Sequence, residues 1–161
     1  MKKIVYFDMD GVLCDWVKGF ESLTDIKVVD FNLMTKETKN RIKQQYFTYE
    51  LFYNLEPFLT TLEIVKLLLQ TNVEVKICTA VGYFNTEQIK QAKQEWVKKY
   101  LGDVGIVFVD KIENKYEAMS KDINFNDYDV VNLFDDRDKA VDAFNKKCEY
   151  TQGKAYKLLG D

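Results

Sequence analysis

A short apolar run near the start of the chain, ended by two carboxylates, constrains the fold more than any other stretch. Residues 4–7 are Ile, Val, Tyr and Phe, a β-branched and aromatic composition typical of a strand buried on both faces of a parallel sheet. Asp8, Asp10 and Gly11 follow at once. Ligands of open parallel sheets bind beyond the carboxyl ends of the strands, so the sequence predicts that both acids lie at such an edge.

The acid pair has a catalytic and a structural interpretation. If the strand stays extended through Asp10, the two-residue period of a strand puts Asp8 and Asp10 on one side, where their repulsion favours a divalent cation with oxygen ligands. Aspartates after a strand also form turns and cap helices without binding anything. The pair alone does not decide between these two interpretations. The residues at the ends of the other strands are needed to decide between them.

The composition is that of a soluble globular protein of about one domain. Of 161 residues, 47% are hydrophobic, which is enough for a sizeable core and too many for a disordered chain. The net charge of -3 provides no positive surface for long nucleic acid. No stretch resembles a signal peptide or a membrane span, and Cys14, Cys78 and Cys148 are too scattered for a disulfide framework. The sequence therefore predicts a cytoplasmic protein without a membrane or long nucleic-acid partner.

Histidine is absent from the chain. This excludes a Ser–His or Cys–His triad, a His-ligated zinc and an imidazole general base. If the protein is an enzyme, then carboxylates, lysines, hydroxyl groups or a metal ion must carry the chemistry.

Strands and helices alternate along most of the chain. The pattern predicts strands at residues 73–77, 105–109 and 129–134, with a short tail strand near 156–159. Helices are expected after Pro57, after a cap at Asn85 and around residues 140–144. Such alternation predicts an α/β fold with a mainly parallel sheet and right-handed crossovers.

One segment interrupts this alternation. Residues 15–56 are helical in pattern and rich in aromatic residues, and they separate the first strand from the rest of the sheet. We therefore expect a catalytic core formed by residues 1–14 and 57–161, with residues 15–56 inserted as a small helical cap.

Three of the predicted strands end in polar residues that suit one chemistry. The first ends in Asp8 and Asp10, and the others end in Thr79 and in Asp135 with Asp136. A lysine is also expected near the end of the third strand, where two candidates lie four residues apart. Lys115 falls where a helix should begin, and Lys111 remains the alternative. Each residue alone could be a cap or a solvated side chain, but their repetition at strand ends favours a common site.

These residues resemble the motifs of a known superfamily. Residues 7–13 (FDMDGVL) are similar to the first motif of the haloacid dehalogenase superfamily of phosphotransferases, Thr79 to its second, Lys115 or Lys111 to its third, and Asp135-Asp136 to its fourth. Residues 8–16 (DMDGVLCDW) and 52–57 (FYNLEP) further resemble the 5′(3′)-deoxyribonucleotidases. The resemblance implies a Rossmann-like three-layer α/β fold with a small helical cap after the first strand.

The resemblance also implies a role for each motif residue. Asp8 would attack phosphorus to form an aspartyl-phosphate, and Asp10 would act in turn as general acid and base. Thr79, the position of Ala80 and the lysine would bind the phosphate, although the family commonly has a serine where this chain has Ala80. Mg²⁺ would be held by the Asp8 carboxylate, the Asp10 backbone carbonyl and Asp135, with Asp136 behind them.

The substrate implied by the resemblance is a nucleoside monophosphate. Trp16 matches the position of an aromatic residue that stacks on the nucleobase in the deoxyribonucleotidases. Sugar phosphates and polynucleotide ends are alternative substrates, and a non-catalytic nucleotide-binding protein with the same fold is an alternative of another class. The oligomeric state stays open, with a homodimer as one alternative.

Two other acid-rich folds do not fit the sequence. An EF-hand calcium loop with Gly11 at its sixth position would need ligands at Tyr6 and Val17, and neither side chain can serve. A receiver domain also combines acids, Thr and Lys, but by resemblance its lysine comes last, whereas an acid pair closes the series here.

Overall fold

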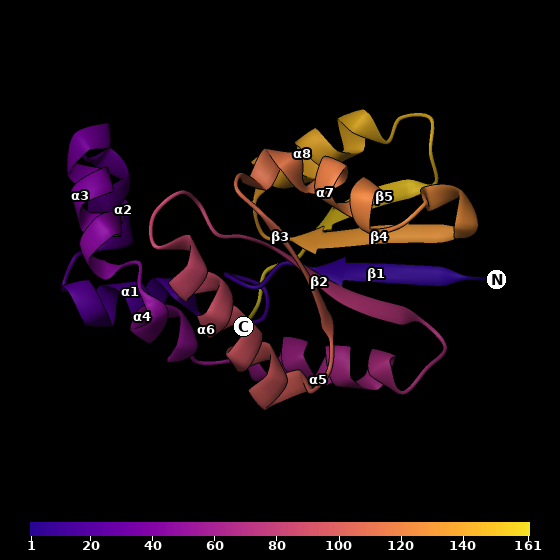
Figure 1. Cartoon of the computed structure of the whole chain (residues 1–161), viewed down its shortest axis with the longest axis horizontal. Helices are drawn as coiled ribbons and strands as arrows, with labels where there is room; N and C mark the ends of the chain where they lie inside the picture. The colour runs from indigo at the N-terminus through magenta and orange to yellow at the C-terminus, as the bar shows by residue number, and fades with distance from the viewer.

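The computed structural model, which describes residues 1–161, contains one five-stranded sheet in which every pairing is parallel. The strand order is β3-β2-β1-β4-β5 (Figure 1). The strands are β1 (Lys3–Phe7), β2 (Glu74–Ala80), β3 (Gly105–Val109), β4 (Val130–Asp135) and β5 (Gly153–Lys157). The first strand of the chain is therefore the central strand of the sheet.

Strand β1 is buried on both faces, as its composition predicts. Val5 and Phe7 belong to one hydrophobic cluster, whereas Ile4 and Tyr6 belong to a second. Because successive side chains of a strand point to opposite faces, the two clusters lie on the two sides of the sheet. This burial orders the strand directly before the acid pair.

Helices cover both faces, which gives three layers (Figure 1). Helices α5 (Leu59–Leu69) and α6 (Thr86–Leu101) contribute to the cluster of Val5 and Phe7. Helices α7 (Lys115–Asp122) and α8 (Asp138–Lys147) contribute to the cluster of Ile4 and Tyr6. Short 3-10 turns, η1 (Ile112–Asn114) and η2 (Phe125–Asp127), flank α7. None of the helices combines the length and apolar character needed to cross a lipid bilayer.

Residues 15–56 contain four helices beside the carboxyl end of the sheet (Figure 1). They are α1 (Trp16–Thr24), α2 (Val28–Leu33), α3 (Lys36–Tyr46) and α4 (Tyr49–Tyr53). Phe20, Phe31 and Phe52 of this insert are buried in the same cluster as Val5 and Phe7. The insert and the core thus share one hydrophobic cluster, and the domain boundaries at 14 and 57 stay a prediction.

Two local predictions differ from the structure. Asn85 precedes α6 but does not cap it, because its φ is 51° and its amide donates instead to the carbonyls of Gln44 and Phe47 in the insert. The last strand, β5, begins and ends earlier than the predicted range of 156–159. Its buried positions are Gly153 and Ala155, so this edge strand lacks the large apolar side chains from which a strand is predicted.

Candidate active site

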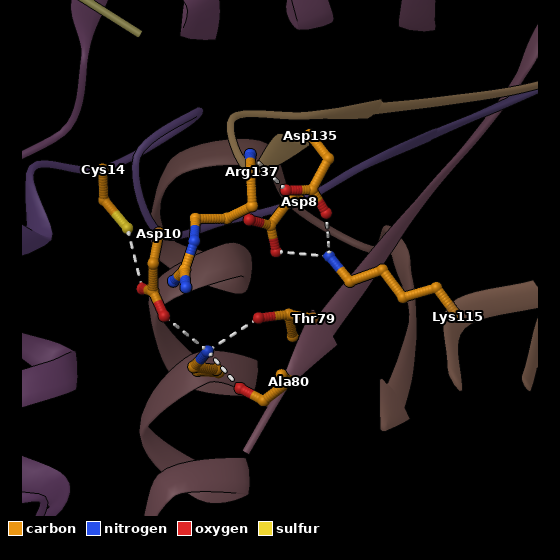
Figure 2. Close-up of polar contacts among 9 residues, drawn as sticks. Asp8, Asp10, Cys14, Thr79, Ala80, Lys115, Asp135 and Arg137 are labelled. Carbon is orange, nitrogen blue, oxygen red and sulfur yellow. Dashed lines mark hydrogen bonds and ion pairs between the residues drawn. The ribbon is translucent and has the colours of Figure 1, made fainter. Parts of the chain in front are cut away.

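The acid pair lies where the chain leaves β1. Strand β1 ends at Phe7, and the backbone N–H of Asp8 still donates to the carbonyl of Phe134 at 2.9 Å. The chain then turns, and the N–H groups of Leu13 and Cys14 both donate to the carbonyl of Met9. The strand therefore does not stay extended through Asp10, and the condition for placing both carboxylates on one side of it is not met. Asp8 and Asp10 bind two different lysines instead (Figure 2).

Lys115 joins the ends of β1 and β4. Its Nζ donates to Asp8 Oδ1 at 2.8 Å and to Asp135 Oδ2 at 2.6 Å, and its side chain is only 1% exposed. Lys111, the alternative candidate, is exposed and lies 5.9 Å from the ring centroid of Tyr83. The structure therefore brings Lys115, and not Lys111, to the acids.

Burial and charge perturb the titration of this group. Burial raises the pKa of Asp8 to about 6, with the Lys115 ammonium acting against the shift and the Asp135 carboxylate adding to it. Burial by itself lowers the pKa of Lys115, but the carboxylates of Asp8 and Asp135 outweigh it and the pKa is raised. The lysine therefore stays charged and compensates the two buried acids.

Asp136 brings a third carboxylate to the same place. Asp8, Asp135 and Asp136 each offer an oxygen, and the three oxygens lie within 4.8 Å of one another. Asp136 Oδ1 is buried without a hydrogen-bond partner, and burial, followed by the charges of Asp8 and Asp135, raises the pKa of Asp136 to about 7. Three oxygens from acids fit a hard divalent cation.

Gly11 is required by this arrangement. A Cβ built on Gly11 would lie 2.1 Å from Asp136 Oδ2, and the φ of Gly11 is +82°, which L-residues with a side chain rarely adopt. The glycine after the acid pair thus lets the backbone turn and also leaves room for the third carboxylate.

A second lysine, Lys93 of α6, holds the other acid. Its Nζ donates to Asp10 Oδ2 at 3.0 Å, to Thr79 Oγ1 at 2.6 Å and to the carbonyl of Ala80 at 2.9 Å. Ala80, a predicted phosphate-binding position, here contributes its backbone carbonyl to Lys93. The predicted residues Asp10 and Thr79 are thus brought together through a residue that the sequence analysis does not single out.

Lys93 carries a sequence signal that could have identified it. It is at the i+4 position from Ile89 and the i−4 position from Val97, on the apolar stripe of a helix. All three residues are buried, and Lys93 is 0% exposed. A lysine in the middle of such a stripe must meet an acceptor inside the protein, because an unpaired buried ammonium is strongly unfavourable.

Arg137 is also missing from the predicted site. It follows Asp135-Asp136, and its backbone N–H donates to Asp135 Oδ1 at 3.0 Å. Its side chain is exposed and extends toward the side of the site where Asp10 lies (Figure 2). A cation directly after the acid pair of β4 is the signal that could have drawn attention to it.

Trp16 lies in the insert and not among the acids and lysines. It is half-buried at the start of α1, with its ring stacked on Phe20 at 4.9 Å between centroids and edge-on to Phe47 at 6.0 Å. A cavity of about 270 Å³ between α1 and α4 shares no residue with the acidic cluster. That cavity is therefore not the candidate site, which is identified by its acids and lysines.

Comparisons with known proteins identify the fold. No family model and no curated protein matches the sequence. Among solved structures, a Burkholderia xenovorans LB400 protein named as a haloacid dehalogenase-like hydrolase superposes with a TM-score of 0.54 at 12% identity, covering 99% of this chain and 82% of that one. A Thermotoga maritima protein named as a β-phosphoglucomutase superposes with a TM-score of 0.53 at 16% identity, covering 99% and 88%. The chain has the haloacid dehalogenase-like fold.

The haloacid dehalogenase-like fold confirms the predicted α/β class with a parallel sheet between helices. At these identities the likeness concerns the fold alone. The narrower resemblance to the 5′(3′)-deoxyribonucleotidases, and the roles of the individual residues, stay predictions.

Proposed function

We propose that this protein is a phosphomonoester hydrolase that forms an aspartyl-phosphate on Asp8. One observation carries the proposal, which is the buried Asp8 carboxylate at the end of the central strand, bound by Lys115 and next to Asp135 and Asp136. Only one Asp8 oxygen accepts a hydrogen bond from Lys115. The other is free to attack phosphorus, so the group is arranged as a nucleophile and not only as a cap.

The remaining groups provide charge and proton transfer. Lys115 and the Thr79 hydroxyl stabilise the negative charge on the phosphoryl oxygens. As the bond from Asp8 to phosphorus forms, the bond to the leaving oxygen breaks, and Asp10 gives that oxygen a proton. Asp10 then takes a proton from water, whose oxygen attacks phosphorus and releases phosphate from Asp8.

We further propose that Mg²⁺ is the cofactor. Asp8, Asp135 and Asp136 would hold it with their carboxylates, together with the backbone carbonyl of Asp10. When bound, the ion neutralises charge on the phosphoryl oxygens and the nucleophile. The unpartnered Asp136 Oδ1 supports this assignment, because a bound cation would give that oxygen a partner.

The Mg²⁺ proposal predicts a pH-dependent stabilisation. Because the pKa of Asp8 is raised to about 6 and that of Asp136 to about 7, the folded protein keeps protons that the unfolded chain has lost. The contribution of these groups to stability therefore falls as the pH rises from about 4 to about 7, and a cation relieves the repulsion above that range. We expect Mg²⁺ at about ten times its Kd to raise Tm by roughly 3–6 °C at about pH 8, and by much less at about pH 5.5.

Differential scanning fluorimetry checks this expectation. Samples without Mg²⁺ are brought to the same ionic strength with NaCl, so that screening of surface charge is equal. An equal Tm shift at both pH values would contradict binding by these carboxylates.

Nucleoside monophosphates, deoxynucleotides above all, are the proposed substrates. Trp16 supports this choice, because its ring is only half-buried and so keeps exposed surface on which a base can stack. Trp16→Ala is expected to raise KM about 5- to 100-fold for nucleotides, as a lost stacking contact of about 1–3 kcal/mol requires, and to raise it little for p-nitrophenyl phosphate. Trp16→Phe is the matched control, and equal effects of Trp16→Ala on both substrates would mean that Trp16 only packs the insert.

A phosphate-release screen tests the proposed function. Wild type and Asp8→Asn are assayed on deoxynucleoside and ribonucleoside monophosphates, sugar phosphates and 5′-phosphorylated oligonucleotides, with Mg²⁺ and with EDTA. Metal-dependent turnover of the wild type supports the proposal, and activity confined to sugar phosphates would overturn only the substrate. Nucleotide binding without turnover would favour a non-catalytic binding protein.

A further inference from the structure

Helix α6 places the ammonium group of Lys93 next to Asp10 and Thr79, where it is fully buried. Lys93 is 0% exposed, and the residues one turn before and after it on the helix, Ile89 and Val97, are buried and apolar. Burying an ammonium is unfavourable unless acceptors surround it. The three acceptors around Lys93 therefore explain how the protein tolerates this buried charge. They also indicate the role of Lys93 in the site.

All three N–H bonds of the ammonium are used within the protein. They point to Asp10 Oδ2, Thr79 Oγ1 and the Ala80 carbonyl at 3.0, 2.6 and 2.9 Å. The ring of Phe52, from α4 of the insert, lies 5.1 Å from Nζ. A lysine has three donors and no acceptor, so none remains for a substrate phosphate. Lys93 thus differs from Lys115, whose partners are the nucleophile and its acidic neighbour.

Two of the three bonds anchor the ammonium, and the third holds Asp10. Thr79 and Ala80 end β2 and are fixed by the pairing of β2 with β3. Asp10 lies in the turn after β1, and its side chain is 29% exposed. Its other oxygen, Oδ1, accepts only a weak bond of 3.6 Å from the Cys14 thiol. The bond to Lys93 is therefore the main hydrogen bond that holds this carboxylate in place.

We propose that Lys93 is a positioning residue that holds Asp10 at the place where it exchanges protons with the leaving group and with water. The inference rests on the proposed phosphatase function. In the first step the bond from Asp8 to phosphorus forms and the bond to the leaving oxygen breaks, while Asp10 gives its proton to that oxygen. In the second step a water oxygen forms a bond to phosphorus and the bond from phosphorus to Asp8 breaks, while Asp10 takes a proton from that water. Lys93 keeps its own proton in both steps.

Substrates with different leaving groups distinguish a positioning role of Lys93 from a structural one. p-Nitrophenolate leaves as a stable anion and needs no proton, whereas an alkoxide does. Lys93→Met is therefore expected to lower kcat/KM about 100-fold for an alkyl phosphomonoester that the wild type hydrolyses, and less than about 5-fold for p-nitrophenyl phosphate. Rapid mixing of the variant with p-nitrophenyl phosphate should give a burst of about one p-nitrophenolate per enzyme, because hydrolysis of the aspartyl-phosphate still needs Asp10.

Two further variants make the experiment decisive. Lys90→Met, on the same helix at an exposed pair with Glu87 of 3.4 Å, is the matched control and should leave both substrates unaffected. Lys93→Ala should regain alkyl phosphomonoester hydrolysis when n-propylammonium is added. An equal loss for both substrates, no loss, or failure of both Lys93 variants to fold would overturn the positioning role. A wild type without phosphomonoesterase activity would instead overturn the proposed function itself, and this inference with it.

Discussion

Replacing Asp8 with asparagine is expected to reduce phosphate release by at least about 10⁴-fold. An amide oxygen is a poor nucleophile, and no other carboxylate both follows β1 directly and accepts a hydrogen bond from Lys115. The variant should still fold, because asparagine removes a buried carboxyl group whose pKa burial raises to about 6. Lys115 also stays paired with Asp135 at 2.6 Å. The measurement is phosphate release at saturating substrate, with circular dichroism to show that the variant is folded.

Acid quenching and mass spectrometry give a second measure of the same prediction. The wild type should carry a phosphoryl group on Asp8 during turnover, and Asp8→Asn should carry none. Asp110→Asn, an exposed carboxylate that follows β3 and accepts from Asn114 at 3.0 Å, is the matched control. A phosphorylated Asp8→Asn variant, or one with more than a few per cent of wild-type turnover, would exclude Asp8 as the nucleophile.

Replacing Lys115 with methionine is expected to destabilise the protein by about 3–5 kcal/mol. The variant leaves Asp8 and Asp135 buried side by side without the cation that both now bind, since the two residues are only 7% and 0% exposed. Chemical denaturation at about pH 8 measures the difference. The difference in the free energy of unfolding should be smaller at about pH 5, because protonation of Asp8 removes one of the two repelling charges.

Lys111→Met is the matched control for this experiment. Lys111 precedes η1, is exposed and forms no ion pair, so its loss should change the free energy of unfolding by less than about 0.5 kcal/mol. Mg²⁺ should recover part of the loss in Lys115→Met, because a cation at the three acids would replace the missing charge. Equal stability of the two variants would show that Lys115 does not compensate the buried acids.

The fold could be predicted because its signals are local. The run at residues 4–7 identifies a strand buried on both faces, and an acid or a hydroxyl directly after a buried strand identifies a carboxyl end. Thr79 and Asp135 therefore follow from the same pattern as Asp8. The edge strand β5 has no such pattern, since its buried positions hold only Gly153 and Ala155, and the predicted range of 156–159 therefore lies later than the strand itself.

The preference for Lys115 over Lys111 rests only on where a helix should begin, and strand ends do not decide it. Lys111 and Lys115 both belong to a polar stretch, and a difference of four residues changes neither composition nor period. Only the packing of α7 against the sheet brings Lys115 Nζ within 2.8 Å of Asp8. The position of Asp136 could not be predicted locally either. Its place beside the other acids requires a residue without a side chain at Gly11, 125 residues earlier in the chain (136 less 11).

By itself the sequence determined that a central buried strand ends in Asp8 and Asp10 and that further strands end in Thr79 and Asp135, because burial and strand period are properties of neighbouring residues. The tertiary structure alone decided that the two acids separate, with Asp8 bound to Lys115 and Asp10 to Lys93. These ion pairs join residues 107 and 83 positions apart. Partners that distant are chosen by how helices pack on the sheet, which no local pattern encodes.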